Sequence, residues 1–308
     1  MEYSGYLDGE FLNTSELFNA LGHAINSAET MARTRISEVF VGVPGEFTTV
    51  IVKEPTLTFP NKRKITGIEI EQLFNVGDNF QNNEEFLLIN RSPIYFTLDD
   101  GRIMIDARDS KTSKLSGQLS YVLAKKKFTN LIGELLKQYD IKKIEYISTS
   151  LAESLYLIDT TERDRFAVLV DIGYTTSSVM LMRGDGLLYL KSFAVGGGHI
   201  TADLYEYFKI PFPVAEELKK KVSLTFAVSS NEAYEIETKT QKYTFPCAEA
   251  HKVVEARLDI IAKLISKCMS LCAIEYPSYI NYKLTGGGVS YMRGAKEYLG
   301  KKLNKNLE

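Results

Sequence analysis

Apolar residues recur at two spacings along the chain, and this predicts helices alternating with strands. Spacings of three and four predict one amphipathic helix between Leu17 and Met31 and another between Phe128 and Tyr139. Short continuous apolar runs predict buried strands, at residues 39–43, 168–170, 179–182 and 187–190. Together these elements predict an α/β protein.

Residues 51–142 have the signals of a separately organised block. Thr66 and Glu69 have the spacing of a capping box, and Asp100-Gly101 predicts a hairpin turn. We expect the helix at residues 128–139 to cover the strands of this block. The sequence therefore predicts an inserted module that folds alone.

The stretch VLVDIGYTTSSVMLM, residues 168–182, combines two apolar runs with a polar turn. Asp171 ends a predicted buried strand, where open α/β sheets place ligands, and Gly173 permits a tight turn. Four hydroxyl residues at 175–178 and their closely spaced amides are typical of an anion nest. Hydrated Mg²⁺ on a nucleotide phosphate would explain a carboxylate beside such a nest. An ordinary turn capped by Asp171 and the hydroxyls is the alternative.

Two glycine triplets favour the phosphate hypothesis. Residues 196–198 precede a helix expected from about Thr201, and its N-terminus is suited to an anion. Residues 286–288 follow the predicted strand INYKLT and precede a second helix. Three phosphate-binding turns in this order are hard to attribute to chance.

The segments DIGYTTSSVMLMRGDG, VGGGHITADL and LTGGGVSYMRGAKEYL resemble three loops of the actin-like ATP-binding superfamily. These are its second phosphate loop, its glycine turn and its adenosine loop. Within the superfamily, nearly the whole chain resembles the FtsA family of bacterial cell-division actin homologues. The resemblance implies an actin-like (ribonuclease H-like) two-lobed α/β fold with an inserted SHS2-type α+β domain. The implied parts are a first lobe at 1–50 and 143–165, the inserted domain at 51–142, a second-lobe core at 166–200 and 251–308, and a small subdomain at 201–250.

The resemblance also implies ATP and Mg²⁺ as ligands, with Asp171 holding the metal through water. In AEELKKK, Glu216 and Lys219 match a family Glu and Lys that reach the ribose and base, although a solvated charged helix face explains either residue better when it is taken singly. The implied nucleotide-binding residues are Asp171, Gly173, Thr175, Thr176, Gly196, Gly197, Gly198, Glu216, Lys219, Gly286, Gly287 and Gly288.

The phosphate loop departs from the family pattern Asp-x-Gly-Gly-Gly-Thr. Tyr174 and Thr175 replace two glycines, and Ser178 stands where an Asp is common. We expect Tyr174 to narrow the approach to the γ-phosphate. No catalytic residue is assigned: Ser150, at the place that orients the attacking water in relatives, is a weak water-positioner. Ser150 and Glu153 also have capping-box spacing, so the sequence predicts at most a slow ATPase.

The function implied by the resemblance is assembly into filaments at the inner membrane face, where the protein links the FtsZ ring to the membrane and the divisome. The FtsZ tail would contact residues 201–250. One alternative is a PilM-like cytoplasmic scaffold of type IV pilus assembly, which shares the superfamily and the insertion. A phosphotransferase of the same superfold needs a general base facing an acceptor pocket, and the first lobe offers no such Asp.

Family members carry a further Asp-x-Gly loop ahead of the segment matching GYLDGE, and a terminal amphipathic helix that binds the membrane. We expect the chain to lack both, so that membrane contact would need a helix absent here. With half of the phosphate contacts missing, ATP binding is expected to be about millimolar or weaker. It is expected to depend on Asp171 and on crowding at Gly287.

Charge and composition narrow the class of protein further. The chain has 37 basic and 39 acidic residues, which argues against nucleic acid as a partner. Its three cysteines form no disulfide framework, and neither a signal peptide nor an apolar run of 18 residues occurs, so a cytoplasmic protein is expected. Cys247/His251 and Cys268/Cys272 are spaced like halves of a zinc site. On one continuous helix the halves would lie about 30 Å apart, which favours core packing.

Overall fold

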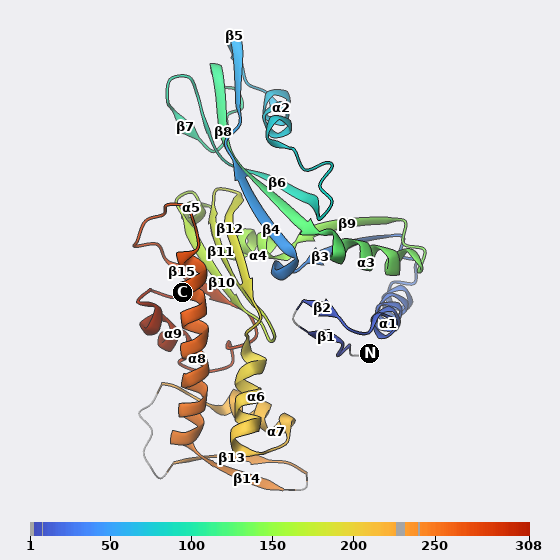
Figure 1. The fold of residues 1–308 in the computed structure, drawn as a ribbon, viewed down its shortest axis with the longest axis vertical. Helices are drawn as coiled ribbons and strands as arrows, with labels where there is room; N and C mark the ends of the chain where they lie inside the picture. The colour runs from blue at the N-terminus through green and yellow to red at the C-terminus, as the bar shows by residue number, and fades with distance from the viewer. Residues whose placement is uncertain (1–2, 8, 226–231, 240) are drawn as a thin grey trace. The chain divides into compact units, whose positions relative to one another are not determined.

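A computed structural model describes residues 3–7, 9–225, 232–239 and 241–308 (Figure 1). The chain divides into two compact units: an N-terminal unit of residues 1–165 and 182–190, and a C-terminal unit of residues 166–181 and 191–308. Helices and strands alternate through both, so the predicted mixed α/β class is confirmed. Asp8 of GYLDGE and residues 226–231 and 240 of the predicted small subdomain lie outside the described ranges.

The first core of the N-terminal unit is built on the parallel strands β3 (Glu38–Val43) and β9 (Lys143–Ser148). Apolar residues of α1 (Thr14–Ala32) and α3 (Lys126–Lys137) pack against the apolar residues of these two strands. The side chain of Asn13 caps α1 by accepting a hydrogen bond from the Glu16 amide. The shorter elements are β1 (Tyr6–Leu7), β2 (Glu10–Phe11), the 3-10 turn η1 (Gly45–Phe47), α4 (Thr149–Leu157) and α5 (Thr160–Arg163).

The second core of this unit belongs to the inserted sheet. Its strands are β4 (Thr48–Lys53), β5 (Thr56–Lys64), β6 (Phe86–Thr97), β7 (Ile103–Met104) and β8 (Lys111–Lys125). The long strand β8 pairs with β6 at one edge and with β4 and β5 at the other. The helix α2 (Gly67–Gly77) begins with the predicted capping box of Thr66 and Glu69 and packs on the sheet through Leu73 and Phe74.

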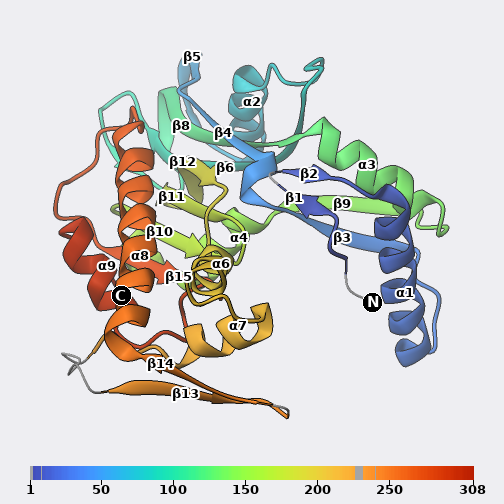
Figure 2. The same cartoon turned by 60° about the horizontal axis from the view of Figure 1, so that its bottom comes forward.

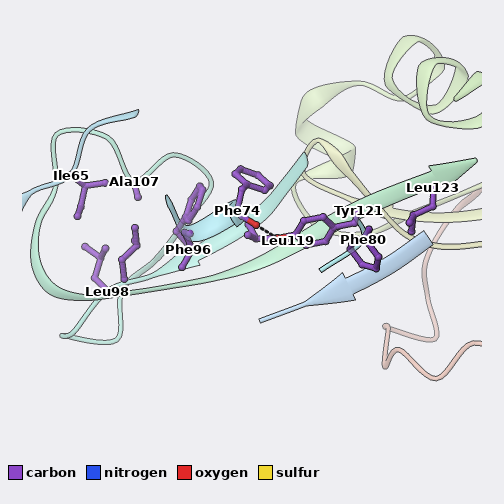
Figure 3. Close-up of a cluster of buried hydrophobic side chains, with 11 residues drawn as sticks. Ile65, Phe74, Phe80, Phe96, Leu98, Ala107, Leu119, Tyr121 and Leu123 are labelled. Atoms are coloured by element: carbon purple, nitrogen blue, oxygen red, sulfur yellow. Dashed lines mark hydrogen bonds between the residues drawn. The ribbon is translucent and has the colours of Figure 1, made fainter. Parts of the chain in front are cut away.

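Tyr121 lies within this core, among the side chains drawn in Figure 3. Its hydroxyl donates a hydrogen bond of 2.8 Å to the carbonyl oxygen of Phe74, which ties β8 to α2. Burial raises the pKa of Tyr121 to about 12, so the hydroxyl stays protonated and keeps donating at neutral pH.

The expectation that the helix at residues 128–139 covers the inserted sheet is wrong. Phe128, Ile132 and Leu136 are buried in the cluster that contains Leu17 of α1, whereas Tyr121 belongs to the other cluster. An apolar helix face predicts that something covers it, and the spacing does not say which element does so. We therefore propose residues 48–125, in place of 51–142, as the inserted module.

The C-terminal unit contains most of a four-stranded sheet, of which residues 182–190 are assigned to the N-terminal unit. The strand order is β12 (Gly186–Phe193), β11 (Ser177–Arg183), β10 (Ala167–Ile172) and β15 (Tyr282–Thr285). β10 is parallel to β15 and Asp171 lies opposite Thr285, so the two strands end at the same edge. β10 is buried from Ala167 to Val170, as predicted for a strand covered on both faces. The predicted hairpin of β11 and β12 is confirmed, since the two strands are neighbours joined at Gly184 and Asp185.

The helices of this unit are α6 (Gly197–Phe208), α7 (Phe212–Lys221), α8 (Cys247–Ser270) and α9 (Ala295–Leu303), as Figure 2 shows. The strands β13 (Ala233–Glu237) and β14 (Lys242–Pro246) form an antiparallel hairpin. The helix α6 begins before the expected Thr201, and α8 ends before the expected Ile274. Among the described residues, no helix is both long and apolar enough to cross a bilayer.

Core packing along α8 accounts for Cys247, His251 and Cys268, which have the spacing of zinc ligands. Cys247 and Cys268 are buried on the same helix. His251 lies between them, and its Nε2 is 2.8 Å from the Tyr234 hydroxyl oxygen. Burial lowers the pKa of His251, which favours the neutral ring. Within the described ranges, no three His, Cys, Asp or Glu side chains are grouped so that they could hold a metal ion.

Residues 48–125, expressed alone, should unfold cooperatively on heating, because the inserted sheet and α2 share one core. Within this fragment, Phe74→Ala should lower the unfolding free energy by about 3–5 kcal/mol, because a buried ring is removed. Scanning calorimetry measures both. Extension to residue 142 adds an apolar helix face without its partner, so the longer fragment should aggregate more readily. A gradual melt of the 48–125 fragment would show that these boundaries are wrong.

Cys268→Ala should lower the unfolding free energy by about 2 kcal/mol, because it leaves a small cavity in the core beside α8. Cys272→Ala is the matched control and should cost less, since Cys272 is only partly buried. Urea denaturation of both variants gives the comparison. Stoichiometric zinc in the purified protein would contradict core packing as the role of these residues.

Candidate functional site

Three loops far apart in the sequence meet where β10 and β15 end. The Gly197 amide donates a hydrogen bond of 2.9 Å to the Gly173 carbonyl oxygen. The Gly198 amide donates one of 2.7 Å to the Tyr174 carbonyl oxygen, and the Gly288 amide donates one of 2.8 Å to that of Ile172. The loops predicted to act together are therefore joined to one another through the backbone.

These contacts require glycine at several positions. A Cβ added to Gly197 would lie 2.1 Å from the carbonyl oxygen of Gly288, and one added to Gly288 would lie 2.2 Å from that of Gly173. Gly286 has a φ of +95°, and a Cβ there would meet Oδ1 of Asp171 at 2.3 Å. The Asp171 carboxylate thus lies against the start of the loop that follows β15.

The crowding expected at Gly287 is wrong. No atom lies within 4 Å of a Cβ added there, and the residue is exposed. The crowded glycines are its two neighbours, Gly286 and Gly288, whose backbones face the β10–β11 loop. Gly287 therefore forms the open side of the loop, where a ligand has room.

Only two of the four hydroxyl residues after Gly173 remain beside the loop surface. Ser177 donates a hydrogen bond of 2.6 Å to the carbonyl oxygen of Val195, and the hydroxyls of Ser178 and Ser192 lie 2.8 Å apart. Both Ser177 and Ser178 are buried in the sheet. Thr175 is exposed and Thr176 is partly buried, so these two are the hydroxyl residues of the loop that solvent can reach.

The N-terminus of α6 does not present its first amides to an anion as expected. Gly197 and Gly198 donate to the β10–β11 loop, and the Gly196 amide donates to Nδ1 of His199 at 3.1 Å. These bonds satisfy donors that a helix N-terminus otherwise leaves free. In this conformation the amides hold the loops together.

Glu216 and Lys219 on α7 extend the site. Lys219 is 5% exposed, so a solvated helix face does not account for it. Its Nζ donates a hydrogen bond of 2.8 Å to Oε2 of Glu216 and one of 3.3 Å to the carbonyl oxygen of Gly197. The Thr201 hydroxyl donates a hydrogen bond to the same Glu216 oxygen. Burial opposes the ionisation of Glu216, but the hydrogen bonds from Lys219 and Thr201 prevail and lower its pKa.

Tyr174 lies against this α7 cluster. Its ring centroid is 5.0 Å from Nζ of Lys219, within the range of a cation–π contact. Burial and the negative charge of Glu216 raise the pKa of Tyr174, so its hydroxyl stays protonated at neutral pH. Residue type does not predict this contact, since it does not encode the direction of a side chain from a loop. The bond from Thr201 to Glu216 is likewise absent from the prediction, although Thr201 follows the second glycine triplet closely in sequence.

Ser150 and Glu153 do not form the capping box that their spacing predicts. The helix α4 begins two residues earlier than that box requires, because the Ser148 hydroxyl accepts a hydrogen bond from the Leu151 amide. Ser150 is 4% exposed, and its carbonyl oxygen accepts from the Ser154 hydroxyl. The N-cap of α4 is thus a different serine from the expected one.

Comparison with known proteins supports the resemblance. A family model described as cell division protein FtsA matches residues 168–308. Proteins named cell division protein FtsA from Bacillus subtilis and Helicobacter pylori strain J99 are 20% and 24% identical to the chain, over 92% and 94% of it. The chain is thus similar to FtsA proteins over most of its length, and its C-terminal part matches their family model. It spans 65% and 64% of the length of these two FtsA relatives.

Solved structures support the fold of this chain. A PilM–PilN type IV pilus biogenesis complex matches with a TM-score of 0.61 and 18% identity, over 100% of this chain and 78% of that one. MreB5 of Spiroplasma citri bound to ADP matches with a TM-score of 0.58 and 12% identity, over 99% of this chain and 73% of that one. The predicted actin-like α/β fold is therefore confirmed.

Gly288→Ala should lower the unfolding free energy by about 1–3 kcal/mol, because its methyl group would overlap the carbonyl oxygen of Gly173. Gly287→Ala is the matched control and should change stability by less than about 0.5 kcal/mol, because its Cβ meets open space. Urea denaturation of the two variants provides the measurement. Equal losses would show that the loops do not pack as described.

Proposed function

We propose that this chain is an actin-like cell-division protein that binds ATP with Mg²⁺ in its C-terminal unit. The junction of three glycine-containing loops at the ends of β10 and β15 is the observation that supports this most directly. Open α/β sheets bind ligands at the carboxyl ends of their strands, and closely packed glycine loops let a ligand approach the backbone.

Each part of the junction is suited to one part of a nucleotide. The amides and hydroxyls at Thr175 and Thr176 would hold phosphate oxygens. Glu216 and Lys219 would contact the sugar and base, as the family resemblance implies. The loop at residues 286–288 would pass beside the adenosine, and the open space at Gly287 is compatible with this.

The donor set fits Mg²⁺ carried by a nucleotide. Asp171 is the last but one residue of β10. Its carboxylate occupies a space that any side chain at position 286 would fill. Mg²⁺ commonly takes one or two carboxylates together with waters and phosphates, so one aspartate is sufficient when the nucleotide brings the rest. When bound, the metal would neutralise phosphate charge, while Asp171 would orient its waters.

Cell division is the role that the family match favours. By resemblance, the chain would work on the cytoplasmic side of the membrane, associate with itself, and link FtsZ and other divisome proteins to the membrane. The subdomain at residues 201–250 would carry the FtsZ contact. We expect at most slow ATP hydrolysis, below about one turnover per second.

A PilM-like scaffold of type IV pilus assembly is the second candidate, and the fold likeness over the whole chain favours it. That likeness is at 18% identity, whereas the proteins matched by sequence carry the FtsA name. Sedimentation with assembled FtsZ filaments, compared with binding to PilN, separates the two. The proposal expects the chain to pellet with FtsZ from its own organism and to leave PilN unbound, and the reverse result would favour the pilus role.

The chain should bind ATP with a Kd of about 1 mM, because several glycine amides are already engaged and few donors remain for phosphate. A Kd of 1 mM corresponds to about 4 kcal/mol, roughly the contribution of two hydrogen bonds to a charged group. Asp171→Ala should weaken MgATP binding at least tenfold and remove its dependence on Mg²⁺. Asp164→Ala, on an exposed turn, is the matched control and should bind as the wild type does. Titration calorimetry with and without Mg²⁺ tests this, and Mg²⁺-dependent binding that survives Asp171→Ala would place the site elsewhere.

A further inference from the structure

The Tyr174 side chain lies on the α6 and α7 side of the β10–β11 loop. A Cβ added to Gly198 would meet its ring carbons at 2.7 and 2.9 Å, so the ring rests on the backbone at the start of α6. The same ring faces the ammonium group of Lys219 at 5.0 Å. The Tyr174 side chain therefore contacts both α6 and α7.

The position of the Tyr174 ring overlaps the part of the site that the family resemblance gives to the sugar and base. Lys219 is enclosed by Glu216, by the Gly197 carbonyl oxygen and by the Tyr174 ring. Thr201 adds a further bond to Glu216. A nucleoside that is to contact Glu216 and Lys219 meets the Tyr174 ring first.

The Tyr174 ring is held by surface contacts, whereas its backbone is held by the loop junction. The Tyr174 carbonyl oxygen accepts the Gly198 amide at 2.7 Å, which anchors the main chain. The residue is 47% exposed, so rotation about its side-chain torsions carries the ring toward water and not through a packed core. The loop can thus open by a side-chain rotation alone.

We propose that Tyr174 gates the nucleoside side of the site: its ring occupies that side in the free protein, and a nucleotide displaces it to reach Glu216 and Lys219. This inference rests on the proposed nucleotide binding. It places the obstruction beside the sugar and base, in contrast to the γ-phosphate side expected from the sequence. Phosphate groups alone would not need to move the ring.

Titration calorimetry of the whole chain with MgADP and with magnesium pyrophosphate tests the gate. Tyr174→Gly should tighten MgADP binding about tenfold, the scale of one displaced cation–π contact. Pyrophosphate binding should stay unchanged, because pyrophosphate has no nucleoside. Tyr174→Phe keeps the ring and should resemble the wild type within about threefold.

Tyr279→Gly is the matched control, a tyrosine that is 83% exposed on the loop between α8 and β15, and it should bind both ligands as the wild type does. Thermal melts confirm that each variant is folded, and Tyr174→Ala replaces the glycine variant if that one is not. Equal MgADP affinity with and without the ring would overturn the gate and leave nucleotide binding intact. Equal tightening of pyrophosphate would place the ring on the phosphate side and also overturn it. Binding of neither ligand by any variant would overturn the gate and the proposed nucleotide binding together.

Discussion

The direct contact of backbone with backbone among Gly173, Gly197 and Gly288 is the constraint on which the rest of the C-terminal unit depends. The carbonyl oxygens and amides of these residues occupy the space where side chains would stand at any other residue type. The contact satisfies the first amides of α6, and for the same reason it withdraws them from a ligand. Under the proposed nucleotide binding, a phosphate would be recognised by Thr175 and Thr176 in the β10–β11 loop, while the open side of the β15 loop lies at Gly287.

The same constraint explains how a lysine can be buried here. A charged group removed from water is tolerated when it is paired and its hydrogen-bond donors are used. The turn that brings Gly197 to the loop junction also leaves its carbonyl oxygen for Lys219, and Glu216 supplies the opposite charge. Removal of one partner would leave the other charge uncompensated, so Glu216 and Lys219 have a structural role even without a ligand.

The sequence predicts this junction because its signals are tied to backbone geometry. Glycine triplets and a carboxylate at a strand end rarely occur together by chance, and parallel strands end at one edge. Side-chain direction and covering partners are different, because neither residue type nor spacing encodes them. Residue type therefore groups Ser178 with the ligand-facing hydroxyls although it pairs with Ser192 in the sheet, and spacing alone assigns the helix at 128–139 to the wrong core. The capping serine of α4 escapes prediction for a related reason, since Ser148 and Ser150 are equally good N-caps by type.

Tyr174 combines backbone geometry with side-chain direction. It lies in a loop that backbone contacts define, but it acts through its side chain. With glycine at that position, Glu216 and Lys219 would lose the ring that covers them, and a ligand would meet them directly. With tyrosine, the ring and a ligand would compete for the same charged pair, Glu216 and Lys219. When a protein must open before it binds, the apparent Kd equals the intrinsic Kd divided by the open fraction, so an open fraction of about one tenth weakens binding about tenfold. In the proposed gate, the substitution would therefore set the nucleotide affinity through the balance of two side-chain positions and would leave the loop junction itself unchanged.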